Sequence, residues 1–93
     1  MPAPKRTIFH NGLVILPDRI LSEGVVLVEG ESIADVRLGA ASGVEADEIL
    51  DLNGRCLAPG LIDIHIHGSH GVDLMAATAD DLLALSRYLL SQG

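Results

Sequence analysis

Three of the four histidines lie in the stretch LAPGLIDIHIHGSHGVD, which runs from Leu57 to Asp73. Two of them, His65 and His67, are separated by one residue and end a run rich in isoleucine. In an extended strand, residues i and i+2 point to the same side, so both imidazoles are expected to face one way. Imidazole nitrogens bind divalent metal ions at about 2.0 to 2.1 Å. The spacing therefore predicts two ligands of one metal site at the end of a strand.

Two histidines do not complete a catalytic metal site, which takes at least three protein ligands. Asp63 faces the same side as His65 but lies about 6.6 Å further along the strand, where a carboxylate supports a ligand instead of binding the metal. His70, in the loop that follows, is a further candidate, and its alternative role is that of a solvated loop residue. The alternative for the pair is that both histidines are exposed and bind nothing. Two histidine ligands suit zinc, iron, cobalt and nickel alike.

A strand before the histidines and a helix after them must hold this site. Alternating isoleucines predict a strand over residues 61–66, and a glycine-rich loop is expected after it. Thr78 and Asp81 have the spacing of a capping box, so a helix is expected from Thr78, with Gly93 as its C-terminal cap. The helix leucines share one face, which predicts packing against a core and no role in cofactor binding. A strand, a loop and a helix form the unit of parallel α/β folds, which carry their chemistry at the carboxyl ends of strands.

The first half of the chain has the pattern of short strands separated by turns. Asn11 and Gly12 predict a tight turn between two strands, and His10, in that hairpin, is expected to have no functional role. The other expected elements are a hairpin of residues 25–28 and 33–37, a loop over residues 40–47 and a strand at 48–52.

Composition limits the class of protein. The chain has 93 residues, of which 48% are hydrophobic and 2% aromatic, so an aliphatic core is expected. Six Lys and Arg against 13 Asp and Glu give a net charge of -7, which disfavours nucleic-acid binding but not one small phosphorylated substrate. The single cysteine, Cys56, cannot form an intrachain disulfide and is expected to be a small buried residue. Without a signal peptide or an apolar run of about 20 residues, a cytoplasmic protein without membrane contact is expected.

The stretch APGLIDIHIHG resembles the start of the barrel in the amidohydrolase superfamily, where P-G-x-x-D-x-H-x-H marks the first strand. The matching residues are Pro59, Gly60, Asp63, His65 and His67. The next stretch is similar to that of the N-acetylglucosamine-6-phosphate deacetylases, with the pattern H-G-x-x-G-x-D-x-M-x-A-T before a helix that ends in glycine. Here the matching residues are Gly68, Gly71, Asp73, Met75, Ala77 and Thr78. The preceding VVLVEGESIADV and LDLNGRCLAPG resemble the β-domain of these enzymes and its passage into the barrel.

The resemblance implies an α/β enzyme, in which a small β-sandwich-type domain (residues 1–57) precedes the first strand and helix of a (β/α)8 TIM barrel (residues 58–93). It implies hydrolysis of N-acetylglucosamine 6-phosphate to glucosamine 6-phosphate and acetate in amino-sugar catabolism by a homodimer. One or two divalent ions, zinc or iron, would be bound by His65 and His67. The supporting or loop-forming candidates are Asp63, Gly68, His70 and Asp73, with His70 standing where relatives commonly have glycine. The general-base aspartate, the other metal ligands and the phosphate-binding residues would lie beyond Gly93.

Two alternatives stay open. Another amidohydrolase, such as a dihydroorotase-like cyclic-amide hydrolase, would share the two histidines, although the stretch HGSHGVDLMAAT favours the deacetylase. A non-enzymatic, β-rich binding or assembly module is the other alternative, and histidines that bind no metal would favour it. The 93 residues alone are expected to be inactive and poorly behaved, because residues 61–66 would lack parallel neighbours on both edges and expose apolar surface.

Overall fold

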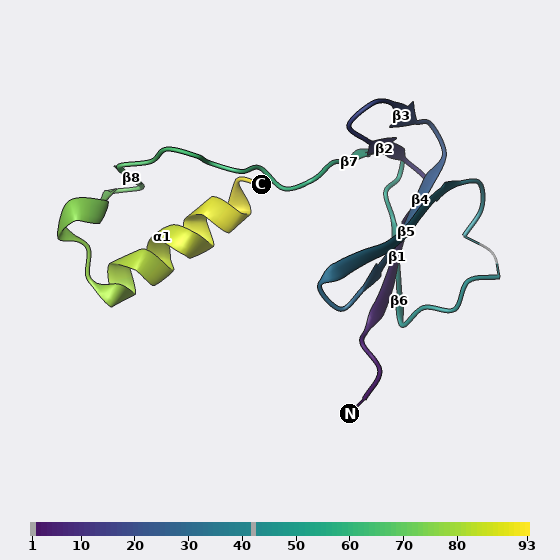
Figure 1. Cartoon of the computed structure of the whole chain (residues 1–93), viewed down its shortest axis with the longest axis horizontal. Coiled ribbons are helices and arrows are strands. Elements are labelled where there is room, and N and C mark those ends of the chain that lie inside the picture. The colour runs from purple at the N-terminus through teal and green to yellow at the C-terminus, as the bar shows by residue number, and fades with distance from the viewer. Residues whose placement is uncertain (1, 42) are drawn as a thin grey trace. The chain divides into compact units, whose positions relative to one another are not determined.

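The computed structural model describes residues 2–41 and 43–93, which divide into two compact units. The first unit ends at Pro59, and the second comprises Gly60–Gly93 (Figure 1). The sequence pattern predicts this boundary between residues 57 and 58. Leu57, which pairs with Val14, is the last residue of the first unit that lies in a strand.

The described part of the first unit consists of two sheets (Figure 1). The four-stranded sheet has the order β5-β4-β1-β6 and contains β1 (Arg6–His10), β4 (Gly24–Glu29), β5 (Ser32–Leu38) and β6 (Glu48–Asp51). The three-stranded sheet has the order β3-β2-β7 and contains β2 (Leu13–Ile15), β3 (Ile20–Leu21) and β7 (Cys56–Leu57). β1 pairs with β6 and β2 with β7 in parallel, whereas the remaining pairs in these sheets are antiparallel. The sheets are therefore mixed, and the expected β-rich region is confirmed.

The hairpin expected from residues 25–28 and 33–37 is confirmed as β4 and β5. Glu29 pairs with Ser32 across a two-residue turn, and Gly30 in that turn has a φ of 59°, which glycine adopts without strain. The expected strand at 48–52 is confirmed as β6. The described residues of the expected loop, 40–41 and 43–47, form no strand or helix, and residue 42 lies outside the described residues.

The tight hairpin expected at Asn11 and Gly12 is wrong. Asn11 does have a positive φ of 60°, but β1 and β2 belong to different sheets and do not pair with each other. The bend carries the chain from one sheet into the other, because β1 is already flanked by β4 and β6. A Cβ atom at Gly12 would lie 2.3 Å from the carbonyl oxygen of Arg55, so only glycine fits where the two chain segments cross.

A second Asn-Gly bend runs beside the first and connects β6 to β7. Asn53 and Gly54 have φ values of 51° and 78°, and the N–H of Gly54 donates a hydrogen bond of 2.8 Å to the carbonyl oxygen of Asn11. The carboxylate of Asp51 joins both bends, because its Oδ1 accepts from the side-chain amide of Asn11 and from the N–H of Asn53, each at 2.8 Å. The two segments that connect β1 to β2 and β6 to β7 thus pass side by side from one sheet to the other.

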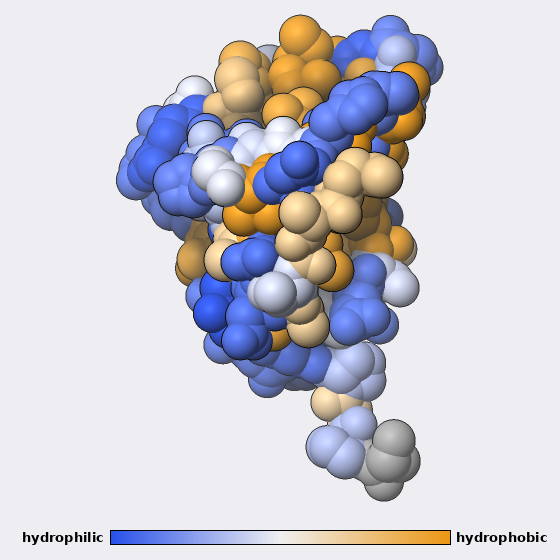
Figure 2. Space-filling view, turned by 90° about the vertical axis from the view of Figure 1, so that its left-hand side faces the viewer, coloured by the Kyte–Doolittle hydropathy of each residue, from blue (hydrophilic) through white to orange (hydrophobic). Residues whose placement is uncertain are grey.

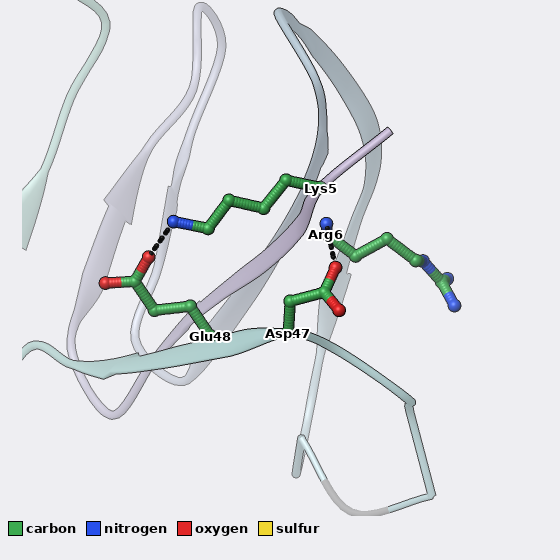
Figure 3. A network of polar contacts seen from close by, with 4 residues as sticks. All are labelled: Lys5, Arg6, Asp47 and Glu48. Atoms are coloured by element: carbon green, nitrogen blue, oxygen red, sulfur yellow. Dashed lines mark hydrogen bonds and ion pairs between the residues drawn. The ribbon is translucent and has the colours of Figure 1, made fainter. Parts of the chain in front are cut away.

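The start of the parallel pair between β1 and β6 is held by charged side chains (Figure 3). Lys5 Nζ lies 2.5 Å from Glu48 Oε2, and the N–H of Arg6 donates to Asp47 Oδ2 at 2.8 Å. The hydrogen bond from Lys5 to Glu48, and then the charge of Glu48, raise the pKa of Lys5. This contribution to stability is therefore present below the ordinary pKa of lysine and is lost as pH rises through the raised pKa.

At the other end of that strand pair, we expect the pKa of Asp51 to be lowered in solution. The N–H of Asn53, and then the side chain of Asn11, donate to the ionised carboxylate and favour it. The resulting stability is present above the ordinary pKa of 3.8 and is lost as pH falls through the lowered pKa. Carboxyl-carbon NMR titration should show Asn11→Ala moving the pKa of Asp51 toward its ordinary value. Asn53→Gly, which keeps the N–H and the positive φ, should leave it low, and equal pKa values in both variants would contradict this account.

The core of the first unit is aliphatic, as the composition predicted. One cluster contains Ile8, Val25 and Leu27. A second cluster contains Val14, Leu21 and Val26. Because successive side chains of a strand point to opposite faces, β4 contributes alternate residues to the two clusters. The central strand β4 is thus covered on both faces, which explains its uninterrupted run of apolar residues.

Cys56 is exposed, so the prediction that it is buried is wrong. β7 is an edge strand, and its neighbouring residue Leu57 points toward the cluster of Val14, Leu21 and Val26. Alternation along the strand therefore turns Cys56 away from that core.

The second unit contains β8 (Gly68–Ser69), β9 (Val72–Asp73), the short 3-10 helix η1 (Leu74–Ala76) and the helix α1 (Ala79–Ser91). The capping box predicted for α1 is confirmed: Thr78 Oγ1 accepts from the N–H of Asp81 at 3.2 Å, and the N–H of Thr78 donates to Asp81 Oδ2 at 2.9 Å. Gly93, which follows the cap residue Gln92, has a φ of 97°, as expected for a glycine that ends a helix. In the part of the chain that the structure describes, no helix is long and apolar enough to cross a membrane.

The strand expected over residues 61–66 is not formed. Residues 60–67, all of which the structure describes, pair with no strand. A strand requires a neighbour that takes up its N–H and carbonyl groups, and the described residues offer none to this segment. The expected exposure of apolar side chains is confirmed, because Ile62 is 87% and Ile64 94% exposed. Among the helix leucines, Leu85 is buried but Leu90 is 81% exposed, so the predicted core-facing stripe is only partly buried.

We expect these exposed side chains to make the 93-residue chain self-associate. Figure 2 shows apolar patches among hydrophilic side chains on the surface that it draws. Replacing Ile62 and Ile64 with lysine removes exposed apolar surface without disturbing a packed core, and should lower the average mass measured by sedimentation velocity. The matched control, Ala84→Lys with Ser86→Lys, adds the same charge at exposed helix positions and should associate like the unchanged chain. Equal association of both lysine pairs would contradict a role for the isoleucines.

Candidate metal centre

His65 and His67 converge on each other. Their Nε2 atoms are 2.9 Å apart, and their ring centroids are separated by 4.8 Å with 60° between the ring planes. Both side chains are exposed. The sequence predicted that the two imidazoles face one way, and the structure confirms this, although the backbone between them is not paired in a sheet.

The imidazole pair fits a divalent metal ion. Two nitrogens that each lie about 2.0 to 2.1 Å from one ion are at most about 4.2 Å apart, and the observed separation of 2.9 Å is within that limit. Neutral imidazole is a good ligand for zinc, iron, cobalt and nickel. Among the residues that the structure describes, no group of three His, Cys, Asp or Glu side chains could hold a metal. The pair therefore supplies two ligands, and a catalytic site would need at least one more from elsewhere.

Asp63 supports the backbone at His65. Its Oδ1 accepts a hydrogen bond of 3.1 Å from the N–H of His65. A short polar side chain that bonds to the backbone two residues further on is typical of an Asx turn. The sequence pattern predicts Asp63 along a strand, on the same side as the imidazoles, whereas in the structure its carboxylate folds back onto the main chain.

The loop after the histidines is a small hairpin that begins directly at His67. The carbonyl oxygen of His67 accepts from the N–H of Leu74 at 3.0 Å, and Gly68 then pairs with Asp73. A Cβ atom at Gly68 would lie 2.0 Å from the carbonyl oxygen of Val72, so the hairpin requires glycine there. Asp73 caps η1, because its Oδ1 accepts from the N–H of Met75 at 3.0 Å. Gly68 and Asp73, both expected to shape the loop, thus have backbone roles in the structure.

His70 has an aromatic partner. It lies at the tip of the hairpin with a φ of 53°, and its ring stacks on that of Tyr88 with centroids 4.1 Å apart and planes 8° from parallel. The interpretation of His70 as merely a solvated loop residue is therefore incomplete. Tyr88 was not predicted from the sequence, because no local pattern connects a loop residue with a position 18 residues further along the chain.

Comparison with known proteins shows where such a segment occurs. No family model matches the chain. The curated relatives include 5-methylthioadenosine/S-adenosylhomocysteine deaminases of Bacillus cereus and Bacillus thuringiensis, 30% identical over 82 residues, with 84% of this chain and 18% of theirs covered. The solved structure of an N-acetyl-D-glucosamine-6-phosphate deacetylase from Mycobacterium smegmatis, in complex with N-acetyl-D-glucosamine-6-phosphate, matches with a TM-score of 0.71 and 25% identity. The match covers 87% of this chain and 20% of that one. The chain corresponds to the N-terminal portion of an amidohydrolase.

A third comparison supports the fold of this amidohydrolase segment. The structure of a Xaa-Pro dipeptidase with bound methionine matches with a TM-score of 0.61 and 23% identity, over 90% of this chain and 22% of that one. The mixed sheets and the helix of the segment thus match the N-terminal parts of these enzymes. The chain spans about a fifth of the length of the relatives it matches.

Proposed function

We propose that this amidohydrolase segment belongs to a metal-dependent hydrolase of carbon–nitrogen bonds, in which His65 and His67 bind a divalent metal ion at the entrance to a (β/α)8 barrel. The observation that carries the proposal is the convergence of the two Nε2 atoms to 2.9 Å. It is supported by the place of these histidines in a segment similar to the N-terminal parts of a deacetylase and of deaminases.

The metal would supply Lewis-acid activation of water and of the substrate carbonyl. The residues of this chain hold and orient the ligands. Asp63 fixes the backbone at His65 through the hydrogen bond of 3.1 Å, and the bond from Leu74 fixes the carbonyl group of His67. Further ligands and the group that accepts a proton from water would come from other parts of the protein.

We propose N-acetylglucosamine 6-phosphate as the substrate, with glucosamine 6-phosphate and acetate as products. The deacetylase structure has the higher TM-score of the two matches described above, and the stretch from His67 to Thr78 resembles the corresponding loop of such enzymes. The proposal includes a homodimer and a location in the cytoplasm. A zinc or iron centre of one or two ions accords with the imidazole ligands.

Hydrolytic deamination is the second candidate function. It is favoured by the 30% identity to 5-methylthioadenosine/S-adenosylhomocysteine deaminases over 84% of this chain. The same pair of histidines would bind the metal in both reactions, so the two candidates differ in substrate and not in the role of His65 and His67.

The experiment that tests the proposal uses the complete open reading frame that contains these residues. The purified protein should release acetate from N-acetylglucosamine 6-phosphate, and a chelator should abolish this release. Ammonia release from 5-methylthioadenosine in place of acetate release would support the deaminase. If the variant with glutamine at both His65 and His67 keeps its activity, the role proposed for the histidines is overturned. Hydrolysis of dihydroorotate would favour a cyclic-amide hydrolase. No hydrolysis of any of these substrates would favour a non-enzymatic module.

A further inference from the structure

The tip of the hairpin that follows His67 has an unusual choice of residue. The turn between β8 and β9 is formed by His70 and Gly71, with φ values of 53° and 79°. Positive φ values at both positions are typical of the turns that close two-residue hairpins, where Asn and Gly are preferred. A histidine at such a position strains its backbone in a way that glycine does not. A side-chain contact that offsets this strain is therefore expected at His70.

That contact is the stack on Tyr88. Ring centroids 4.1 Å apart and planes 8° from parallel make this a face-to-face contact between two flat side chains. Tyr88 is half-buried and lies one helical turn from the buried Leu85, in a helix whose start is held by a capping box. The helix thus offers His70 an anchor that is fixed at several points.

The hairpin connects this anchor to the candidate metal ligand. Gly68 pairs with Asp73 and Ser69 with Val72, so only two residue pairs separate the tip from His67. The carbonyl oxygen of His67 accepts from the N–H of Leu74, directly after β9. A hairpin this short is marginally stable by itself. Without an anchor at its tip, the backbone of His67 would move with the hairpin.

We propose that the stack of His70 on Tyr88 positions the imidazole of His67 beside that of His65. His70 and Tyr88 are positioning residues in this proposal and do not bind the metal. The inference rests on the proposed function in so far as the pair is a metal site. The arrangement of the two imidazoles can, however, be measured without a metal.

The test compares Tyr88→Leu with Tyr88→Phe in the 93-residue chain. Leucine removes the flat ring and keeps apolar volume, whereas phenylalanine keeps the ring. The nuclear Overhauser effect between the ring protons of His65 and His67 should weaken in Tyr88→Leu and persist in Tyr88→Phe. The affinity for Co²⁺, followed by visible absorption, should fall by roughly tenfold in Tyr88→Leu and stay unchanged in Tyr88→Phe. A loss of about tenfold is the smallest effect usually seen when a residue that orients a metal ligand is lost.

A second variant is the control for unfolding of the helix in Tyr88→Leu. Circular dichroism would detect such unfolding. His70→Gly removes the stacking ring but suits the positive φ, so it should weaken the Overhauser effect and the affinity while the helix is retained. An unchanged Overhauser effect in both His70→Gly and Tyr88→Leu would overturn the inference. No Co²⁺ binding by the unchanged chain, with an Overhauser effect that still depends on Tyr88, would overturn the metal site and support the positioning role.

Discussion

Replacing both His65 and His67 with glutamine is expected to abolish specific binding of divalent metal ions to the chain. The two Nε2 atoms are 2.9 Å apart on exposed side chains, and no group of three His, Cys, Asp or Glu among the described residues could hold a metal ion in their place. Residues that merely orient ligands contribute roughly 10- to 100-fold to metal affinity, so loss of the ligands themselves should exceed this range. Isothermal titration with Zn²⁺ would measure the change.

The matched control is His10→Gln. His10 is a half-buried histidine on β1 in the first unit, for which no role is expected. Metal affinity should be unchanged in this variant. Binding lost equally in His10→Gln and in the double variant would show that the metal binds histidines without preference, and binding retained in the double variant would place the site elsewhere.

Ile8→Ala is expected to lower the free energy of unfolding of the first unit by about 2 to 5 kcal/mol, the usual cost of truncating a buried isoleucine. Ile8 is 0% exposed and packs with Val25 and Leu27 at the centre of its cluster. Small domains are stable by only about 5 to 15 kcal/mol, so this loss would be a large fraction of the total stability. Urea denaturation followed by circular dichroism would measure it.

Ile33→Ala provides the comparison. Ile33 lies on β5, in the same sheet, but is 69% exposed. Its truncation should change the free energy of unfolding by no more than about 0.5 kcal/mol. Similar losses at Ile8 and Ile33 would contradict the placement of the core around Ile8.

The elements that sequence analysis predicted correctly are those fixed by neighbouring residues. The hairpin of β4 and β5 follows from a glycine between two apolar runs, and α1 from the capping box of Thr78 and Asp81. The predicted hairpin at Asn11 and Gly12 was wrong because a turn residue sets the local bend but not the strand that pairs next. Cys56 was misplaced for a related reason, since only the sheet order reveals that β7 is an edge.

The site was predictable only in part. The spacing of His65 and His67 correctly predicted that their imidazoles face one way, because it depends on two adjacent peptide units. The strand expected beneath them did not form, since pairing depends on neighbours that no local pattern supplies. The contact between His70 and Tyr88 depends on how the hairpin and the helix pack, which neither segment specifies alone. The metal role and the substrate stay predictions.

The parallel pairing of β1 with β6 bears on the order in which the first unit assembles. β1 lies between β4 and β6, and its parallel partner begins at Glu48, about 40 positions after Thr7. The local hairpin of β4 and β5 closes a far shorter loop, so it is expected to form early, whereas β6 joins late. Until Asp51 has emerged from the ribosome, one edge of β1 stays open. β1 would then present an unpaired and vulnerable edge during synthesis.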